Sequence, residues 1–162
     1  MASRYWPTRD TNLAKRFNDE LIGNLKDGKS GIIGQEVIIY RVSTYETSPN
    51  MYGEAGESGK VYEAGVKLSC IIDAQDFDWE TNEFGSDSNQ TATFSFQRDM
   101  LIDVSFRPDI GDVLSWNHGY FEINSTNENQ LVAGDYNKNW TISCDAVLTR
   151  ISTLNIERTR AF

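Results

Sequence analysis

Residues 91–97 read TATFSFQ, in which Ala92, Phe94 and Phe96 alternate with Thr and Ser. Residues 140–148, WTISCDAVL, repeat this pattern, with an apolar side chain at every second position. Successive side chains of a β-strand point to opposite faces, so the alternation predicts strands with one face against a core. These two stretches indicate a mainly β protein.

Further strands are predicted on either side of these two, at residues 36–42, 66–73, 101–106, 113–116, 120–125 and 131–133. A tight turn is predicted at Asn117-His118-Gly119, with the glycine in the position that needs a positive φ. About seven strands with such close turn signals are typical of a small β-barrel or sandwich.

One amphipathic helix is predicted near the N-terminus. Its apolar residues recur every four positions, at Leu13, Phe17, Leu21 and Leu25. Asp10 or Thr11 would cap it and Asp27-Gly28 would end it, after about 15 residues. We expect the stripe to pack on the core; packing against a neighbouring subunit is the alternative. Trp6-Pro7 predicts an extended arm before the helix.

The chain of 162 residues is therefore divided into three parts. Residues 1–30 form an arm and a helix, residues 31–150 a β-barrel domain, and residues 151–162 a C-terminal tail. The barrel domain contains a long polar loop, residues 43–65, with Tyr45, Met51 and Tyr52. Long loops in small barrels tend to be functional, and Tyr and Met suit contact with a partner.

Residues 74–90 are acidic and also contain Phe77, Trp79 and Phe84. Carboxylates at positions 76, 78 and 80 imitate a calcium-binding loop, but Thr81 stands where such a loop needs glycine. A solvated acidic hairpin is the expected structure.

Charge is distributed unevenly along the chain, whose net charge is −9. Residues 1–30 hold six basic and four acidic groups, and residues 150–162 have a net charge of +2. Residues 31–149 hold 6 basic and 19 acidic groups. This acidic body disfavours tight binding of duplex DNA, because phosphate contacts need Lys and Arg. It indicates either ordinary solubility or complementarity between the ends and bodies of an assembly.

The chain has few groups suited to catalysis. His118 is its one histidine and lies at a predicted turn. Cys70 and Cys144 fall on strand faces, where buried thiols are expected, and a disulfide between adjacent strands is left open. Phosphate-binding glycine motifs, a signal-peptide core and apolar runs of about 18 residues are absent from the sequence. We therefore predict no enzyme activity, no cofactor, no metal and no membrane span.

A family resemblance is carried by residues 108–114, PDIGDVL, by Trp116, and by residues 118–123, HGYFEI. This stretch resembles the pattern P-x-x-G-D-h-h, a short turn and G-x-Y/F-F/Y-E-h (h apolar) of tailed-phage connector proteins. The order of helix, strand, long loop and closing strand 140–150 is similar too. The resemblance extends over most of the chain and is nearest to neck, or head-closure, proteins of contractile-tailed phages.

The resemblance implies a virion structural protein, made in the host cytoplasm, that forms a homo-oligomeric ring, a hexamer, at the head–tail junction. It would lie between the portal or adaptor protein and the tail terminator or another tail protein, and it would retain packaged DNA. DNA would pass through an acidic lumen without specific binding. Within this interpretation we predict the interface residues Trp6, Tyr45, Met51, Tyr52 and Arg158.

Two other classes of protein stay open. A carbohydrate-binding β-sandwich would use Trp79, Phe84 or Trp116 as a stacking platform. A small β-barrel enzyme would work through carboxylates such as Asp76, although the sequence offers no base and nucleophile that converge.

Overall fold

The structure is a computed structural model, and it describes residues 8–25, 28–47, 60–82, 85–128 and 140–149. The predicted strand 131–133, the first seven residues of the arm and the tail 151–162 lie outside the described residues. Within the described part of the chain, neither helix is long and apolar enough to cross a membrane.

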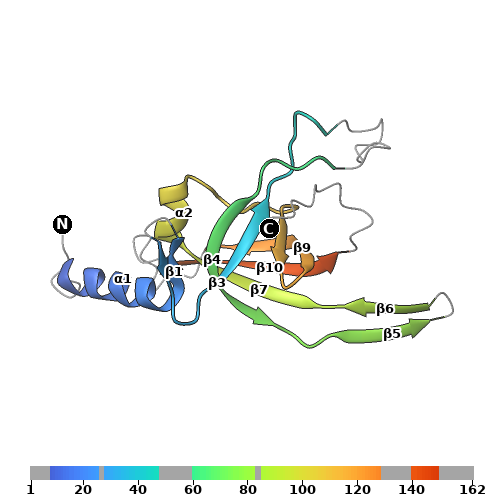
Figure 1. The fold of residues 1–162 in the computed structure, drawn as a ribbon, viewed down its shortest axis with the longest axis horizontal. Coiled ribbons are helices and arrows are strands. Elements are labelled where there is room, and N and C mark those ends of the chain that lie inside the picture. The colour runs from blue at the N-terminus through green and yellow to red at the C-terminus, as the bar shows by residue number, and fades with distance from the viewer. Residues whose placement is uncertain (1–7, 26–27, 48–59, 83–84, 129–139, 150–162) are drawn as a thin grey trace.

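Six antiparallel strands close into a barrel, in the order β10-β7-β4-β3-β8-β9 (Figure 1). They are β3 (Gln35–Tyr40), β4 (Val66–Ala74), β7 (Thr91–Gln97), β8 (Val113–Trp116), β9 (Gly119–Asn127) and β10 (Thr141–Thr149). The prediction of a small β-barrel with an N-terminal helix is confirmed. Closure leaves the barrel without open edges that would pair with other chains.

The core is formed by the inward-facing side chains that the alternation predicted. Phe94, Phe96 and Phe121 are fully buried inside the barrel. Trp116 meets Phe94 edge to face, with ring centroids 6.2 Å apart. Each fully buried large apolar side chain stabilises the fold by about 2 kcal/mol, so this aromatic cluster is a main source of stability.

The prediction of a strand at residues 101–106 is wrong, because Arg98–Val104 form a helix, α2. Its buried residues are the adjacent Met100 and Leu101, whereas Ile102 is 61% exposed. Two neighbouring buried residues fit a short helix better than a strand, whose neighbours face opposite sides. Ser105 ends α2 in the left-handed conformation, with φ 55°.

The hairpin turn between β8 and β9 also differs from its prediction. The positive φ values belong to Asn117 (46°) and His118 (64°), and Gly119 is the first residue of β9. A two-residue turn of this type needs positive φ at both central residues, and asparagine accepts it more readily than most.

The two cysteines are free and buried, as expected for structural thiols. Cys70 is paired with Phe96 of β7, and Cys144 with Phe94 of the same strand. Because β7 lies between their strands, the cysteines do not belong to adjacent strands. Burial raises the pKa of each thiol to about 12.

We expect both thiols to resist modification while the protein is folded, since the thiolate is the reactive form and the side chains are covered. An Ellman titration at pH 8 should detect close to none of the thiols in the native protein and both in guanidinium chloride. Rapid labelling of either cysteine without denaturant would contradict the buried positions.

The N-terminal helix α1 (Thr8–Ile22) begins earlier than predicted and ends before Leu25. Gly23, with φ 82°, reverses the chain after it, because glycine adopts this conformation without a Cβ clash. β1 (Gly23–Asn24) and β2 (Lys29–Ser30) then form a small two-stranded sheet.

The chain that returns after this sheet satisfies the last carbonyls of α1. The backbone N–H of Ile32 donates to the carbonyl of Glu20, and those of Ile33 and Gly34 donate to the carbonyl of Leu21. The hydroxyl of Ser69 in β4 donates to the carbonyl of Ile22 at 2.5 Å. The helix end is therefore fixed to the barrel wall.

Replacing Gly34 with alanine is expected to lower the free energy of unfolding by about 1–3 kcal/mol, as overpacking does elsewhere. A Cβ at Gly34 would overlap the backbone of Ile22, which has no flexible end to move aside. Thermal unfolding measures the loss. Ile32→Ala, at a position that is 79% exposed, is the matched control. Equal stability of the two variants would contradict the close packing.

The acidic segment 74–90 contains the expected hairpin, formed by β5 (Asp78–Asn82) and β6 (Gly85–Asn89). Figure 1 shows that β5 follows β4 and β6 leads into β7, so the two pairs form one long ribbon that projects from the barrel.

Candidate interaction surfaces

The motif that carries the family resemblance forms a tight turn against the barrel. Gly111 has φ 93°, and its N–H donates to the carbonyl of Ile123 at 2.9 Å. The backbone N–H of Ile123 donates in return to the carbonyl of Asp112. The side chain of Asp112 is buried and accepts a hydrogen bond from the N–H of Asp109 at 3.0 Å. The Gly-Asp pair therefore holds a turn together.

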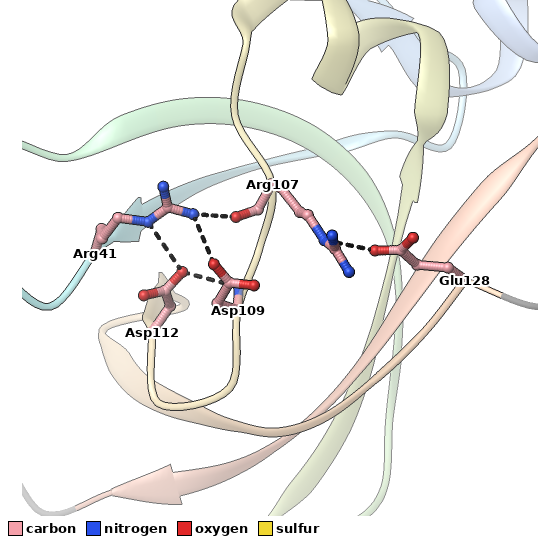
Figure 2. A network of polar contacts seen from close by, with 5 residues as sticks. All are labelled: Arg41, Arg107, Asp109, Asp112 and Glu128. Carbon is pink, nitrogen blue, oxygen red and sulfur yellow. Dashed lines mark hydrogen bonds and ion pairs between the residues drawn. The ribbon is translucent and has the colours of Figure 1, made fainter.

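Arg41 ties this turn to the segment that follows β3 (Figure 2). Its Nη2 lies 3.2 Å from Oδ2 of Asp109 and also donates to the carbonyl of Arg107. Its Nε lies 3.8 Å from Oδ2 of Asp112. The guanidinium also lies over the ring of Phe106, 4.7 Å from the ring centroid.

The electrostatics of this network are set by burial. Burial raises the pKa of Asp112, while the N–H groups of Asp109 and Val42 and the charge of Arg41 act in the opposite direction. Next to it, Nε of Arg107 pairs with Glu128 at 2.8 Å (Figure 2). Because the Asp112 carboxyl is covered, its contacts with Asp109 and Arg41 serve as a structural clamp on the turn.

Metal-binding chemistry has little support in the described part of the chain. Its residues contain no group of three or more His, Cys, Asp or Glu placed to hold a metal ion. Asp76, proposed for a carboxylate enzyme, is exposed on the projecting ribbon.

The apolar stripe of α1 faces solvent, so the expectation that it packs on the core is wrong. Leu13, Phe17 and Leu21 are 50%, 56% and 40% exposed. The helix instead turns a small face toward the barrel and buries Ile22. Lys15 pairs with Asp99 at 2.8 Å, and Gln97 donates to Asp19 at 2.7 Å. These contacts orient the helix with its large apolar side chains outward.

The ribbon of β5 and β6 carries a second exposed apolar group. Phe77 and Trp79 are 50% and 68% exposed, with ring centroids 6.2 Å apart. The exposed Asp76 and Asp78 alternate with them. Paired aromatic rings at the surface are typical of interaction sites.

Of the five predicted interface residues, the structure describes Tyr45, which is 98% exposed. Trp6, Met51, Tyr52 and Arg158 lie outside the described residues. The two described ends of the predicted loop 43–65 lie side by side, since Val42 and Tyr62 form a β-bridge and the N–H of Ser43 donates to the carbonyl of Val61.

The sequence prediction missed Arg41, Phe77 with Trp79 as a pair, and the outward orientation of α1. Arg41 and Asp109 are 68 positions apart, so no local pattern joins them. The alternation of Phe77 and Trp79 with two aspartates was a usable signal, because side chains two positions apart in an extended chain point to the same side.

The described residues form a closed six-stranded barrel with a projecting helix and a projecting ribbon, both of which expose apolar side chains. No family model matches the chain, and no curated protein matches it. The fold is similar to that of a chain in the solved "Virion of native gene transfer agent (GTA) particle". The TM-score is 0.50 at 13% identity, over 70% of this chain and 91% of that one. At this identity the likeness concerns the fold.

Proposed function

We propose that this protein is a virion structural protein, a neck or head-closure ring that joins the portal-side connector to the tail and retains packaged DNA. The observation that carries the proposal is the likeness of fold, which extends over 91% of a chain from the virion of a gene transfer agent particle. The resemblance of residues 108–123 to the turn pattern of connector proteins also supports it, and the Gly-Asp pair of that pattern forms the clamped turn at Asp112.

The exposed surfaces fit an assembly role. A small domain that leaves Phe17, Trp79 and Tyr45 largely in water gains stability when neighbouring proteins cover these side chains. Stable interfaces bury roughly 800 Å² on each partner. A projecting helix and ribbon add contact area that the barrel wall alone lacks. We propose Tyr45, together with Trp6, Met51, Tyr52 and Arg158, as interface residues.

The acidic body fits passage of DNA. Residues 31–149 hold 19 acidic and 6 basic groups. A ring lumen lined by such a surface repels phosphates, so DNA would slide through it without being held.

The test is a protein inventory of purified particles, beside a mutant that lacks this chain. We expect the chain as a few-copy component of the particle, and heads that leak DNA beside detached tails in the mutant. Plasmid-borne wild-type chain should restore tailed particles and serves as the control. Absence of the chain from purified particles would refute the proposed function.

The exposed pair of Phe77 and Trp79 favours one second candidate, a carbohydrate-binding module. Trp116, the other described residue of that platform, packs against Phe94 and Phe121, and its Nε1 donates to Gln35 at 2.7 Å. If this candidate is right, a polysaccharide column should retain the wild-type protein and should not retain the Trp79→Ala variant. Elution of wild type and variant together in the void volume would reject it.

A further inference from the structure

The helix α1 is attached to the barrel with little apolar packing. Ile22, its last residue, is the one residue of α1 that is buried. Leu13, Phe17 and Leu21, the stripe that an amphipathic helix normally packs on a core, are 50%, 56% and 40% exposed. Most of the stability of a helix in a protein comes from the packing of such a face. Within the described part of the chain, α1 therefore has little of the packing that usually stabilises a helix.

Two side-chain contacts, which we call the latch, join the middle of α1 to the barrel and to α2. Nζ of Lys15 lies 2.8 Å from Oδ2 of Asp99, the second residue of α2. Nε2 of Gln97, at the end of β7, donates to Oδ1 of Asp19 at 2.7 Å. The side chains of Lys15 and Asp99 are 46% and 44% exposed, so water competes for their charges. Ion pairs that are this exposed add little stability.

The buried side of the latch is incompletely satisfied. Gln97 is 4% exposed, and its Nε2 is bonded to Asp19. Its Oε1 is buried and has no hydrogen-bond partner among the residues that the structure describes. A buried acceptor without a partner costs free energy, which hydration recovers. Because the amide of Gln97 meets α1, separation of the helix admits water to this group, and the latch resists opening only weakly.

The C-terminal end of α1 is attached more firmly. Ile22 is buried, and its carbonyl accepts a hydrogen bond from the hydroxyl of Ser69 in β4. Backbone N–H groups of the returning chain donate to the carbonyls of Glu20 and Leu21. Gly23 follows with φ 82°, which glycine adopts without strain. The chain therefore has a fixed point at the end of α1 and a weakly held helix before it.

We propose that α1 is a latched helix, which detaches from the barrel and melts as one unit, back to the fixed point at Ile22, while the barrel stays folded. Melting accompanies detachment, because isolated helices of about 12–15 residues are marginal in water. The strength of the latch then sets how often the helix is released. This opening belongs to the free chain and does not depend on assembly.

Ordinary fraying of the helix end is a different behaviour. Fraying begins at Thr8, and the protection of the backbone N–H groups then rises steadily toward Ile22. A latched helix opens as a whole, so N–H groups on both sides of Lys15 share one opening free energy. The pattern of protection along α1 therefore separates the two behaviours.

Hydrogen exchange, measured by NMR on the purified full-length protein, tests the opening. The informative N–H groups of α1 are those of residues 12–19, because the first four N–H groups of a helix have no acceptor within it. We expect them to be protected to a similar degree, and at least about 100-fold less than those of β7, because local opening costs less free energy than global unfolding. Equal protection in α1 and β7 would overturn the proposal, and so would protection that climbs steadily along residues 12–19.

The latch is tested with Lys15→Ala, and Arg16→Ala is the matched control. Both variants shorten a long basic side chain of the same helix, but the exposed side chain of Arg16 lies outside the latch. Lys15→Ala should speed exchange about 2–5-fold at all of residues 12–19, as loss of an exposed ion pair predicts, and leave β7 unchanged. Acceleration confined to the turn around residue 15, or equal exchange in the two variants, would overturn the latch.

A double-mutant cycle assigns the effect to the contact itself. Asp99→Ala should speed exchange in α1 as Lys15→Ala does. The double variant should exchange no faster than the faster single variant, because the second change removes a contact that is already lost. Accelerations that multiply in the double variant would show that the two side chains act separately and would overturn the ion pair as part of the latch.

Discussion

Replacing Asp112 with alanine is expected to lower the free energy of unfolding by about 3 kcal/mol. The carboxyl is buried and accepts the N–H of Asp109, with Nε of Arg41 3.8 Å away. Alanine leaves the N–H groups of Asp109 and Val42 without this acceptor. The side chain of Arg41 is 35% exposed, so water solvates part of its charge once the carboxylate is removed. The expected loss of unfolding free energy therefore lies at the lower end of the range for buried ion pairs.

Urea denaturation measures this loss, with Asp109→Ala as the control. Asp109 also contacts Arg41, but its side chain is 62% exposed. Its removal should therefore cost less than about 1 kcal/mol. Losses of equal size in the two variants would show that burial of Asp112 does not matter.

The same carboxyl predicts a pH dependence. Burial raises the folded pKa of Asp112 above its ordinary value of 3.8. Just above that value, the folded protein holds a proton that the unfolded chain has lost, so the stability contributed by Asp112 falls as pH rises through the folded pKa. Unfolding free energies of wild type and Asp112→Asn, compared from pH 3.5 upward, should show this fall in wild type relative to the variant. A difference independent of pH would contradict the raised pKa.

The barrel was predictable mainly because β7 and β10 alternate apolar and polar side chains. β7 and β8 were predicted with the bounds that the structure shows, and Cys70 and Cys144 were expected to be buried. In such segments, burial of one strand face is visible in the sequence as an alternation of apolar and polar residues.

Short apolar runs were less informative. Ile102, Val104 and Phe106 alternate as in a strand, yet residues 98–104 form the helix α2, whose buried residues are Met100 and Leu101. A run this short is compatible with the two-residue period of a strand and with the 3.6-residue period of a helix. Packing against the barrel then decides between strand and helix.

The helix α1 shows a different limit. The spacing of Leu13, Phe17 and Leu21 correctly indicated an amphipathic helix, but a periodic stripe does not say which molecule covers it. The orientation is decided by contacts with distant residues, such as that of Asp19 with Gln97. The same holds for Arg41, whose role at the Asp112 turn depends on residues far along the chain.

Removing the β5–β6 ribbon should abolish assembly and leave the barrel intact. The proposed change replaces residues 77–89 with Asn-Gly, a pair that favours two-residue hairpin turns. Ala74 pairs with Ala92, and the N–H of Gln75 donates to the carbonyl of Thr91 at 3.0 Å. The side-chain amide of Gln90 also donates to the carbonyl of Gln75 at 2.9 Å. These contacts hold the cut ends together, so the shortened chain can turn there.

We expect thermal unfolding of the shortened protein to resemble wild type, because the fully buried core residues Phe94, Phe96 and Phe121 belong to strands that remain. Incorporation into particles should be lost, since the exposed rings of Phe77 and Trp79, which the proposed function places in a contact of the assembly, are gone. The full-length double variant with Phe77→Ser and Trp79→Ser removes the two aromatic side chains but keeps the ribbon. It should show the same loss of incorporation into particles. Tailed, DNA-filled particles that contain the shortened chain would show that the ribbon is dispensable and that assembly depends on other surfaces.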